Sequence, residues 1–131
     1  MSGCHNCVSR SATEEPSVTQ KSIQTEFKGG AKKEVMHKLR MDLIPPEMIE
    51  GLAAVLTYGT TKYGDRNWEQ GIPFMTSYAA AMRHLVQFAK HNDIDRESGL
   101  IHLEQAACNL LMIATQIRRA RTDLDDRSNI K

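Results

Sequence analysis

The chain has 131 residues, a length that fits one small domain, and its 17 basic and 16 acidic residues leave a formal net charge of +1. This balance disfavours a nucleic-acid-binding protein, so we expect no sequence-specific nucleic-acid partner. No apolar run reaches the roughly 18 residues that span a bilayer, and residues 1–10 lack the apolar core of a secretory signal. We therefore expect a cytoplasmic location and no membrane partner.

Residues 1–33 are rich in Ser, Thr, Glu, Lys and Gly and poor in large apolar side chains. Such a segment buries too little surface to offset the entropy lost on ordering, so it is predicted to be a flexible, disordered tail. In this tail Cys4 and Cys7 form a lone CxxC around His5, and because a zinc site needs four ligands we expect no structural zinc. The folded domain is predicted over residues 34–122, followed by a polar tail over residues 123–131.

The first helix is predicted from about Pro46 to Tyr63, because proline suits the first helical turn and apolar residues then recur at helical spacing. Gly, Asp, Asn and Pro next predict a loop over residues 62–73. A second helix is expected to begin after a cap at Thr76 or Ser77 and to reach about His91.

A third helix is expected to begin after a cap at Ser98 and to reach about Ala120. Residues 106–114 are apolar nearly all round, which predicts that this stretch is buried, with Cys108 as a small hydrophobic side chain. Strand-like alternation is not found, so the prediction is an all-α fold, a small bundle of three to four helices behind a disordered N-terminal tail. Because the core is small, we also expect a homo-oligomer, a dimer or a tetramer.

A polar stripe runs along the third predicted helix, where His102, Gln105 and Asn109 lie at positions i, i+3 and i+7 and share a face. On a buried helix such a stripe suits a metal or ligand site, or alternatively a hydrogen-bond network that fixes helix register. The preceding loop offers Asp93, Asp95 and Glu97, whose carboxylates either hold Mg²⁺ or Mn²⁺ or complement the helix dipole. The sequence leaves both alternatives open.

Three more groups of residues have two interpretations each. Arg83 and His84 are either a phosphate contact and a ligand or ordinary surface residues. Glu47 and Glu50 either supply carboxylates for a metal-bound water or accompany a helix dipole. The loop after the first helix mixes cations, rings and an amide, which suits a nucleotide, although its Trp alternatively anchors the loop to the core. The loop residues are Lys62, Tyr63, Arg66, Asn67 and Trp68.

Several short strings occur in the order and spacing of one protein family. They are Lys38–Pro46, Leu56–Gly59, Lys62–Gly64, Asn67-Trp68, Arg83-His84-Leu85, Asp95, Glu97-Ser98-Gly99, His102-Leu103 and Asn109. Over about residues 30–117 the chain resembles the phage dATP/dGTP diphosphohydrolase N-terminal domain family, a relative of the MazG-like all-α nucleotide pyrophosphohydrolases. The resemblance implies a metal-dependent hydrolase that cleaves dATP and dGTP to monophosphate and pyrophosphate, and so adjusts the nucleotide pool in the host cytoplasm during phage infection.

The resemblance also assigns roles to residues. The acidic motifs EExxE and ExxD of MazG-like enzymes are absent here, where the matching positions hold Arg83, His84, Gln87, Ala106 and Asn109, and Gln105 stands where a histidine is expected. The expected catalytic residues are Glu50, Glu97 and His102; the substrate contacts are Lys62, Tyr63, Arg66, Asn67, Trp68 and Arg83; and the ligands of Mg²⁺ or Mn²⁺ are Glu47, Glu50, His84, Asp95, Glu97, His102 and Asn109. The alternative is a non-catalytic helical phage module that binds a nucleotide or a partner.

Overall fold

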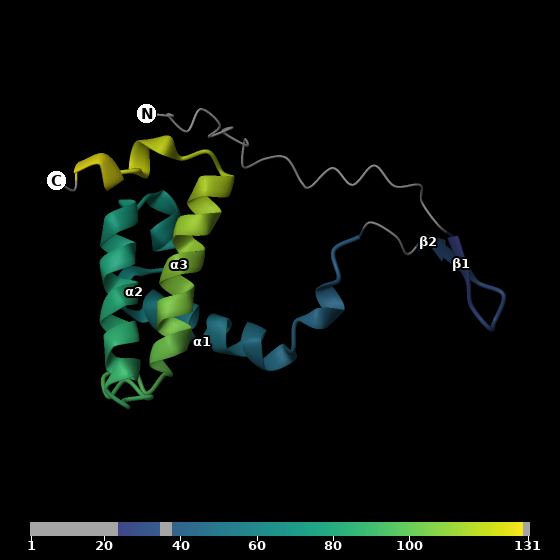
Figure 1. Cartoon of the computed structure of the whole chain (residues 1–131), viewed down its shortest axis with the longest axis horizontal. Helices are drawn as coiled ribbons and strands as arrows, with labels where there is room; N and C mark the ends of the chain where they lie inside the picture. The colour runs from purple at the N-terminus through teal and green to yellow at the C-terminus, as the bar shows by residue number, and fades with distance from the viewer. Residues whose placement is uncertain (1–23, 35–37, 130–131) are drawn as a thin grey trace, which may run out of the picture.

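A computed structural model describes residues 24–34 and 38–129 of the chain. Three helices dominate this part: α1 (Pro46–Tyr63), α2 (Phe74–Ala89) and α3 (His102–Arg118) (Figure 1). A two-stranded antiparallel hairpin, β1 (Gln24–Glu26) and β2 (Lys32–Glu34), precedes them. Single 3₁₀ turns lie at Met41–Leu43, Asn67–Gln70, Thr122–Leu124 and Arg127–Asn129. The predicted all-α bundle is confirmed.

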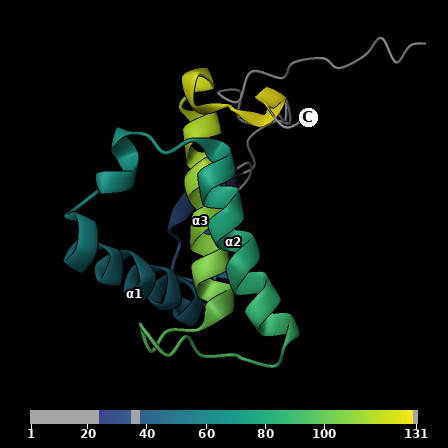
Figure 2. The ribbon, with the colours of Figure 1, turned by 90° about the vertical axis from the view of Figure 1, so that its left-hand side faces the viewer.

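Helices α2 and α3 run side by side along most of their length, whereas α1 crosses α3 near one end (Figure 2). Gly51, buried in α1, lies at this crossing, and a Cβ at its position would meet the carboxylate of Glu104 on α3. This crossing brings the C-terminal half of α1 toward the loop that joins α2 to α3.

Apart from Phe74, the core between α2 and α3 is built from small and polar side chains. Its buried apolar members are Phe74, Ala81, Ala106 and Cys108, and its buried polar members are Ser77, His102, Gln105 and Gln116. Cys108 is the small buried residue that the sequence predicted, and burial raises the pKa of its thiol to about 11. Buried polar groups need hydrogen-bond partners, so a core of this kind constrains how the two helices are aligned.

The bounds of α1 agree with the prediction, but the predicted N-cap residues of α2 and α3 are both wrong. Helix α2 begins at Phe74, because the Pro73 carbonyl accepts hydrogen bonds from the backbone N–H groups of Thr76 and Ser77, at 3.0 and 3.4 Å, and so already opens the first turn. Helix α3 begins at His102, with Ile101 as its cap residue, and Ser98 belongs to the preceding loop. A proline at the N-cap position and a structured loop thus override cap preference.

Both helix ends come two residues earlier than predicted. Helix α2 ends at Ala89 and α3 at Arg118, and the chain then turns through left-handed conformations, with φ +64° at His91 and +56° at Ala120. The left-handed region cannot continue a right-handed helix. The predictions of His91 and Ala120 as helical residues are therefore wrong.

Two further expectations need correction. Leu110 and Leu111 on α3 are 44% and 49% exposed, so the stretch predicted to be buried has one solvent-facing side. Residues 24–34 form a hairpin of exposed residues inside the segment predicted to be a structureless tail. The remaining tail residues, with Cys4, His5 and Cys7, lie outside the described part of the chain. Across residues 24–34 and 38–129, no helix is both long enough and apolar enough to cross a membrane.

Candidate functional site

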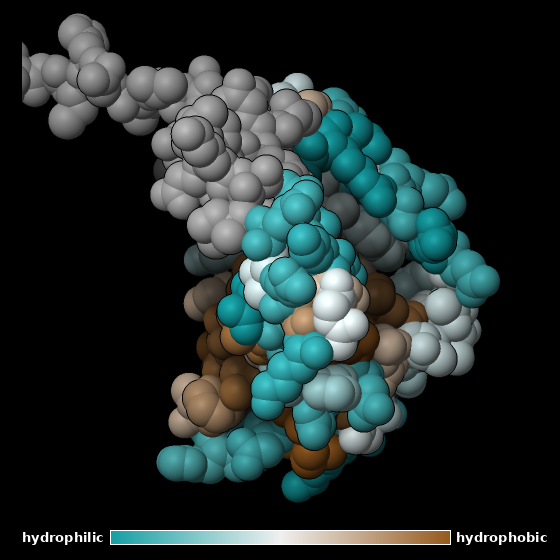
Figure 3. Space-filling view, turned by 90° about the vertical axis from the view of Figure 1, so that its right-hand side faces the viewer, coloured by the Kyte–Doolittle hydropathy of each residue, from teal (hydrophilic) through white to brown (hydrophobic). Residues whose placement is uncertain are grey.

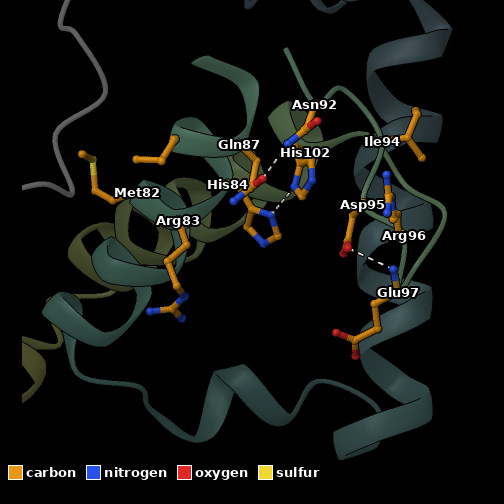
Figure 4. Close-up of a pocket in the computed structure, with 11 residues that line it drawn as sticks. Met82, Arg83, His84, Gln87, Asn92, Ile94, Asp95, Arg96, Glu97 and His102 are labelled. Atoms are coloured by element: carbon orange, nitrogen blue, oxygen red, sulfur yellow. Dashed lines mark hydrogen bonds between the residues drawn. The ribbon is translucent and has the colours of Figure 1, made fainter. Parts of the chain in front are cut away.

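A pocket of about 810 Å³, open to solvent, lies between α2, the loop over residues 90–101 and the first residue of α3 (Figure 4). It combines imidazoles, guanidinium groups and carboxylates with an apolar wall. Its lining residues are Met82, Arg83, His84, Val86, Gln87, Asn92, Ile94, Asp95, Arg96, Glu97 and His102.

The loop holds its own shape around the Asp95 carboxylate. Asp95 Oδ1 accepts a hydrogen bond from the Glu97 backbone N–H at 3.0 Å, and Oδ2 accepts one from Ser98 Oγ at 2.9 Å. Gly99, with φ +73°, turns the chain so that its N–H donates to the Asp95 carbonyl at 2.7 Å. Aspartate and serine favour such local turns because their side chains mimic a backbone acceptor or donor.

Helix α3 anchors this loop through Gln105, which is 7% exposed. Its Nε2 donates to Asp95 Oδ2 at 3.1 Å and to Ser98 Oγ at 3.2 Å. Burial by itself would raise the pKa of Asp95, but the hydrogen bonds from Glu97 N–H, Gln105 and Ser98 outweigh it and hold that pKa below its usual range. Asp95 is therefore a carboxylate at neutral pH, and these hydrogen bonds hold its side chain in one orientation.

Two histidines meet at the inner side of the pocket. Nδ1 of His84 on α2 lies 2.9 Å from Nδ1 of His102 on α3, with ring centroids 5.2 Å apart. Because one of these nitrogens must donate and the other accept, both cannot carry a proton on Nδ1. Burial, followed by the neighbouring His102, lowers the pKa of His84. Figure 4 shows both rings next to the open volume of the pocket.

At the rim, Glu97 meets two side chains of α1. Lys62 Nζ forms an ion pair with Glu97 Oε1, and Tyr58 Oη donates to the same oxygen at 3.4 Å. The Lys62 ammonium also lies 5.1 Å from the centre of the Tyr58 ring. The hydrogen bond from Lys62 holds the pKa of Glu97 below its usual range, and the same contact raises the pKa of Lys62. The rim is thus a charged contact between α1 and the loop.

The structure brings together part of the predicted site. The predicted residues that line the pocket are Arg83, His84, Asp95, Glu97 and His102, and Lys62 reaches its rim through Glu97. Glu47 and Glu50 are exposed near the start of α1 and do not line the pocket. Tyr63 is 69% exposed, and Asn109 Nδ2 donates to the Gln105 carbonyl at 2.9 Å. These four residues are therefore not joined to the pocket.

The turn around Trp68 lies at the other end of α3. Gln116 Nε2 donates to the Trp68 carbonyl at 3.3 Å, and the Arg119 guanidinium lies 5.6 Å from the Trp68 ring. Gln116 follows His102 by 14 residues, a rise of about 21 Å along a helix. Trp68 thus anchors its turn to α3, as one of the two interpretations had it. The structure does not bring Arg66, Asn67 and Trp68 to the pocket.

The predicted metal ligands do not form one cage. Within residues 24–34 and 38–129, no three His, Cys, Asp or Glu side chains are grouped closely enough to hold a metal ion by themselves. The three helices and the loop before α3 carry the seven expected ligands, and only four of the seven line the pocket: His84, Asp95, Glu97 and His102.

Sequence reasoning missed the apolar wall and a second guanidinium. Met82 and Val86 have the spacing of a helix core stripe, yet they are 41% and 44% exposed and line the pocket with Ile94. Arg96 lies between Asp95 and Glu97 in the loop and also lines the pocket. Cationic groups beside an apolar wall suit a ligand with both anionic and flat hydrophobic parts.

We predict that Gln105→Leu loosens the loop without unfolding the bundle. The change leaves the Asp95 carboxylate one donor short, a loss of about 1–3 kcal/mol for a buried polar group. Hydrogen exchange at the amides of Asp95 and Gly99, which bond within the loop, should become about tenfold faster or more. Gln70→Leu, at an exposed position far from the loop, serves as control; equal exchange in both variants would contradict the anchoring role.

Comparison with known proteins identifies the family of the chain. The family model for dATP/dGTP diphosphohydrolase, N-terminal, matches residues 28–127. A dATP/dGTP diphosphohydrolase of Salmonella phage PMBT28 is 39% identical over 90 residues, which cover 69% of this chain but only 30% of that relative. The chain therefore spans less than a third of the relative's length. No solved structure matches. The family match takes in all three helices and the pocket between them, and the chain belongs to the dATP/dGTP diphosphohydrolase N-terminal family.

Proposed function

We propose that this domain hydrolyses purine deoxynucleoside triphosphates, dATP and dGTP, to monophosphate and pyrophosphate with a divalent metal ion. The observation that carries the proposal is the pocket, in which two guanidinium groups, two imidazoles and two carboxylates surround one open volume of about 810 Å³. The name of the phage relative gives the substrate class. Because the chain spans 30% of that relative, the relative's activity is proposed, rather than known, for this chain.

Arg83 and Arg96 are the proposed phosphate contacts. They lie on different elements, α2 and the loop, and neither forms an ion pair with a carboxylate of the described residues. A guanidinium group binds two phosphate oxygens in one plane, so two such groups can orient a triphosphate. The base and sugar would lie against the apolar wall of Met82, Val86 and Ile94.

In the proposed reaction, water attacks the α-phosphorus and the bond from that phosphorus to the oxygen bridging to the β-phosphorus breaks. Pyrophosphate leaves, and Glu97 accepts a proton from the attacking water. Glu97 is ionised at neutral pH, as a proton acceptor must be, although the hydrogen bond from Lys62, which lowers its pKa, makes it a weaker base as long as that contact persists. A bound Mg²⁺ or Mn²⁺ would neutralise phosphate charge and activate water.

The donors in the pocket fit a divalent ion in kind, since imidazole and carboxylate both bind Mn²⁺ and carboxylate binds Mg²⁺. The described residues offer no group of three, so phosphate oxygens of the substrate and water would complete the coordination. Kinase and ATPase sites also leave part of the coordination of Mg²⁺ to phosphates and water. Glu47, Glu50 and Asn109 are not part of this proposed set.

A non-catalytic nucleotide-binding module is the alternative, and one observation favours it: both carboxylates of the pocket already have partners within the protein, Asp95 with Gln105 and Ser98, and Glu97 with Lys62. Incubation of the purified protein with each of the four deoxynucleoside triphosphates and Mn²⁺ or Mg²⁺, followed by separation of the products, distinguishes the two. Monophosphate and pyrophosphate from dATP and dGTP support hydrolysis. Intact nucleotide that is nevertheless retained by the protein supports the binding module.

Substitution of Glu97 by Gln is predicted to lower turnover by about 10²- to 10⁴-fold, the usual contribution of a proton-transfer group. The side chain is largely exposed, so the variant should keep the circular dichroism spectrum of the parent protein. Pyrophosphate release measures turnover, and Asp123→Asn, an exposed carboxylate near the C-terminus, is the matched control. Turnover unchanged in Glu97→Gln would remove Glu97 from the reaction.

We also propose that the protein acts in the cytoplasm of a phage-infected cell and forms a homo-oligomer. An arm made of residues 38–45 and the first turn of α1, up to residue 49, projects away from the bundle (Figure 1). Figure 3 views the side from which the arm projects and shows hydrophobic side chains at the surface there. Six large apolar residues of the arm are 40–71% exposed: Leu39, Met41, Leu43, Ile44, Met48 and Ile49. A large exposed apolar patch of this kind marks an interaction site.

Leu43→Asp is therefore predicted to weaken self-association at least tenfold, because it places a charge in the apolar arm. Sedimentation velocity over a range of protein concentrations measures the effect. Thr122→Asp, an exposed residue after α3, should leave the association unchanged. A parent protein that sediments as a monomer at all concentrations would exclude the homo-oligomer.

A further inference from the structure

We infer that α3 pairs with the α3 helix of a second copy of this chain, antiparallel and about a two-fold axis. The inference rests on the proposed homo-oligomer and names a surface through which two copies meet. That surface is the side of α3 that faces solvent, which we call the α3 stripe. Its five residues are all apolar and exposed: Leu103, Ala107, Leu110, Ala114 and Ile117.

The α3 stripe has the spacing of a helix-packing seam. Its members follow one another after four, three, four and three residues, the alternation that keeps apolar side chains on one face over two heptads. The other side of α3 is already packed, and its buried residues are His102, Gln105, Ala106, Cys108 and Gln116. A helix that is apolar nearly all round is normally buried on every side. Helix α3 therefore has one contact face that residues 24–34 and 38–129 leave uncovered.

Large and small side chains alternate along the α3 stripe, which makes it complementary to a copy of itself. Alanine separates each large side chain from the next, and the large ones are 39–44% exposed. In one antiparallel register, Leu110 lies opposite Ala114 of the second copy. The same register places Ala107 opposite Ile117. Each branched side chain then fills the space above an alanine, and small residues let the two helix axes approach to about 8 Å.

Charge complementarity favours the same antiparallel pairing. Glu104, Leu111 and Arg118 follow one another at intervals of seven residues along one flank of the α3 stripe. Neither Glu104 nor Arg118 forms an ion pair with the described residues. In the antiparallel pair, Glu104 of each copy comes beside Arg118 of the other, and the two Leu111 side chains meet near the two-fold axis. A parallel pair would instead place like charges together.

A groove beside the α3 stripe gives the second copy room to dock. It has a volume of about 320 Å³, lies between α2 and α3, and contains Leu110, Ala114 and Ile117 together with Tyr78 of α2. Tyr78 is itself 44% exposed, so the apolar surface continues from α3 onto α2. Because a two-fold interface uses the same patch on both copies, each copy offers this groove to the large side chains of the other.

Disulfide cross-linking in the full-length chain tests the pairing directly. Leu111→Cys, in a chain whose Cys4 and Cys7 are replaced by serine, should form a covalent dimer on mild oxidation, because residue 111 meets its own copy near the two-fold axis. The remaining Cys108 is buried. Thr122→Cys in the same background is the control, since Thr122 is also exposed but lies beyond the end of α3. Non-reducing gel electrophoresis should show at least tenfold more linked dimer for Leu111→Cys.

Sedimentation velocity provides a second test, which needs no cross-link. Leu110→Asp should weaken self-association at least about tenfold, because it places a charge in the α3 stripe. Phe88→Asp, at a similarly exposed apolar residue of α2 outside the stripe, should leave association unchanged. Arg118→Glu should weaken association as well, and Glu104→Lys added to Arg118→Glu should restore it by exchanging the two charges.

The outcomes separate this inference from the proposals on which it rests. Leu111→Cys that links no better than Thr122→Cys, or Leu110→Asp that associates like the parent protein, would overturn the pairing of α3 helices. If association were lost only in Leu43→Asp, the arm would join the copies, and the homo-oligomer would stand without this pairing. Dimers linked through Leu111→Cys that hydrolyse no nucleotide would overturn the proposed reaction and leave the pairing standing.

Discussion

Replacement of His102 by alanine is expected to abolish hydrolysis of dATP and dGTP, with a loss of at least about 10³-fold. The change removes one of the two nitrogens that meet at 2.9 Å and leaves His84 without its partner. It also empties the inner side of the pocket, where His102 is 8% exposed. Turnover is measured as pyrophosphate release with Mn²⁺.

The protein should nevertheless stay folded. Loss of a buried hydrogen-bonding side chain costs about 1–3 kcal/mol, and small domains are stable by about 5–15 kcal/mol. Far-ultraviolet circular dichroism checks that the helices remain, and His91→Asn, at an exposed position with φ +64° that asparagine tolerates, serves as the control with unchanged turnover. If His102→Ala turned over normally, the pair would be a structural feature of the core; if it unfolded, His84→Gln would carry the test.

The second large effect is on stability. Phe74→Ala should destabilise the protein by about 3–5 kcal/mol, the cost of removing a phenyl group from a core. Phe74 is 4% exposed at the start of α2, lines a groove with Leu110 and Ile117 of α3, and has the Arg127 guanidinium 6.0 Å from its ring. Thermal unfolding should shift downward by about 12 °C or more in a domain of this size.

Phe88 provides the comparison, since it lies near the other end of α2 and is 47% exposed. Phe88→Ala should cost clearly less, about 1 kcal/mol, because half of the ring is already in water. Circular dichroism followed with temperature measures both variants. Equal shifts for the two substitutions would mean that Phe74 is not the main contact between the N-terminal end of α2 and α3.

The local sequence determined some of these elements and not others. Helix α1 was predicted to its last residue, because Pro46 at its start and Gly64 after its end are strong signals. The start of α2 was missed, because Thr76 and Ser77 are good caps by type while Pro73 had already begun the turn. The start of α3 was missed for a related reason: Ser98 satisfies Asp95 rather than a helix end.

The sequence predicted only those site residues that lie close to one another along the chain. His102 and Gln105 were singled out by their helical spacing, and Asp95 and Glu97 by their position before a helix. The contact of Lys62 with Glu97 spans 35 residues and that of Gln116 with Trp68 spans 48, and no periodicity encodes such contacts. Met82 and Val86 were missed as pocket residues because apolar spacing does not tell a core from a cavity wall.

Hydrolysis of dGTP in ¹⁸O-labelled water with Mn²⁺ tests most directly whether this pocket directs water to the α-phosphorus. Attack there predicts that one ¹⁸O enters dGMP while pyrophosphate stays unlabelled, and mass spectrometry of the products reads this out. Unchanged dGTP, or label in pyrophosphate, or release of deoxyguanosine and triphosphate, would contradict the proposed reaction.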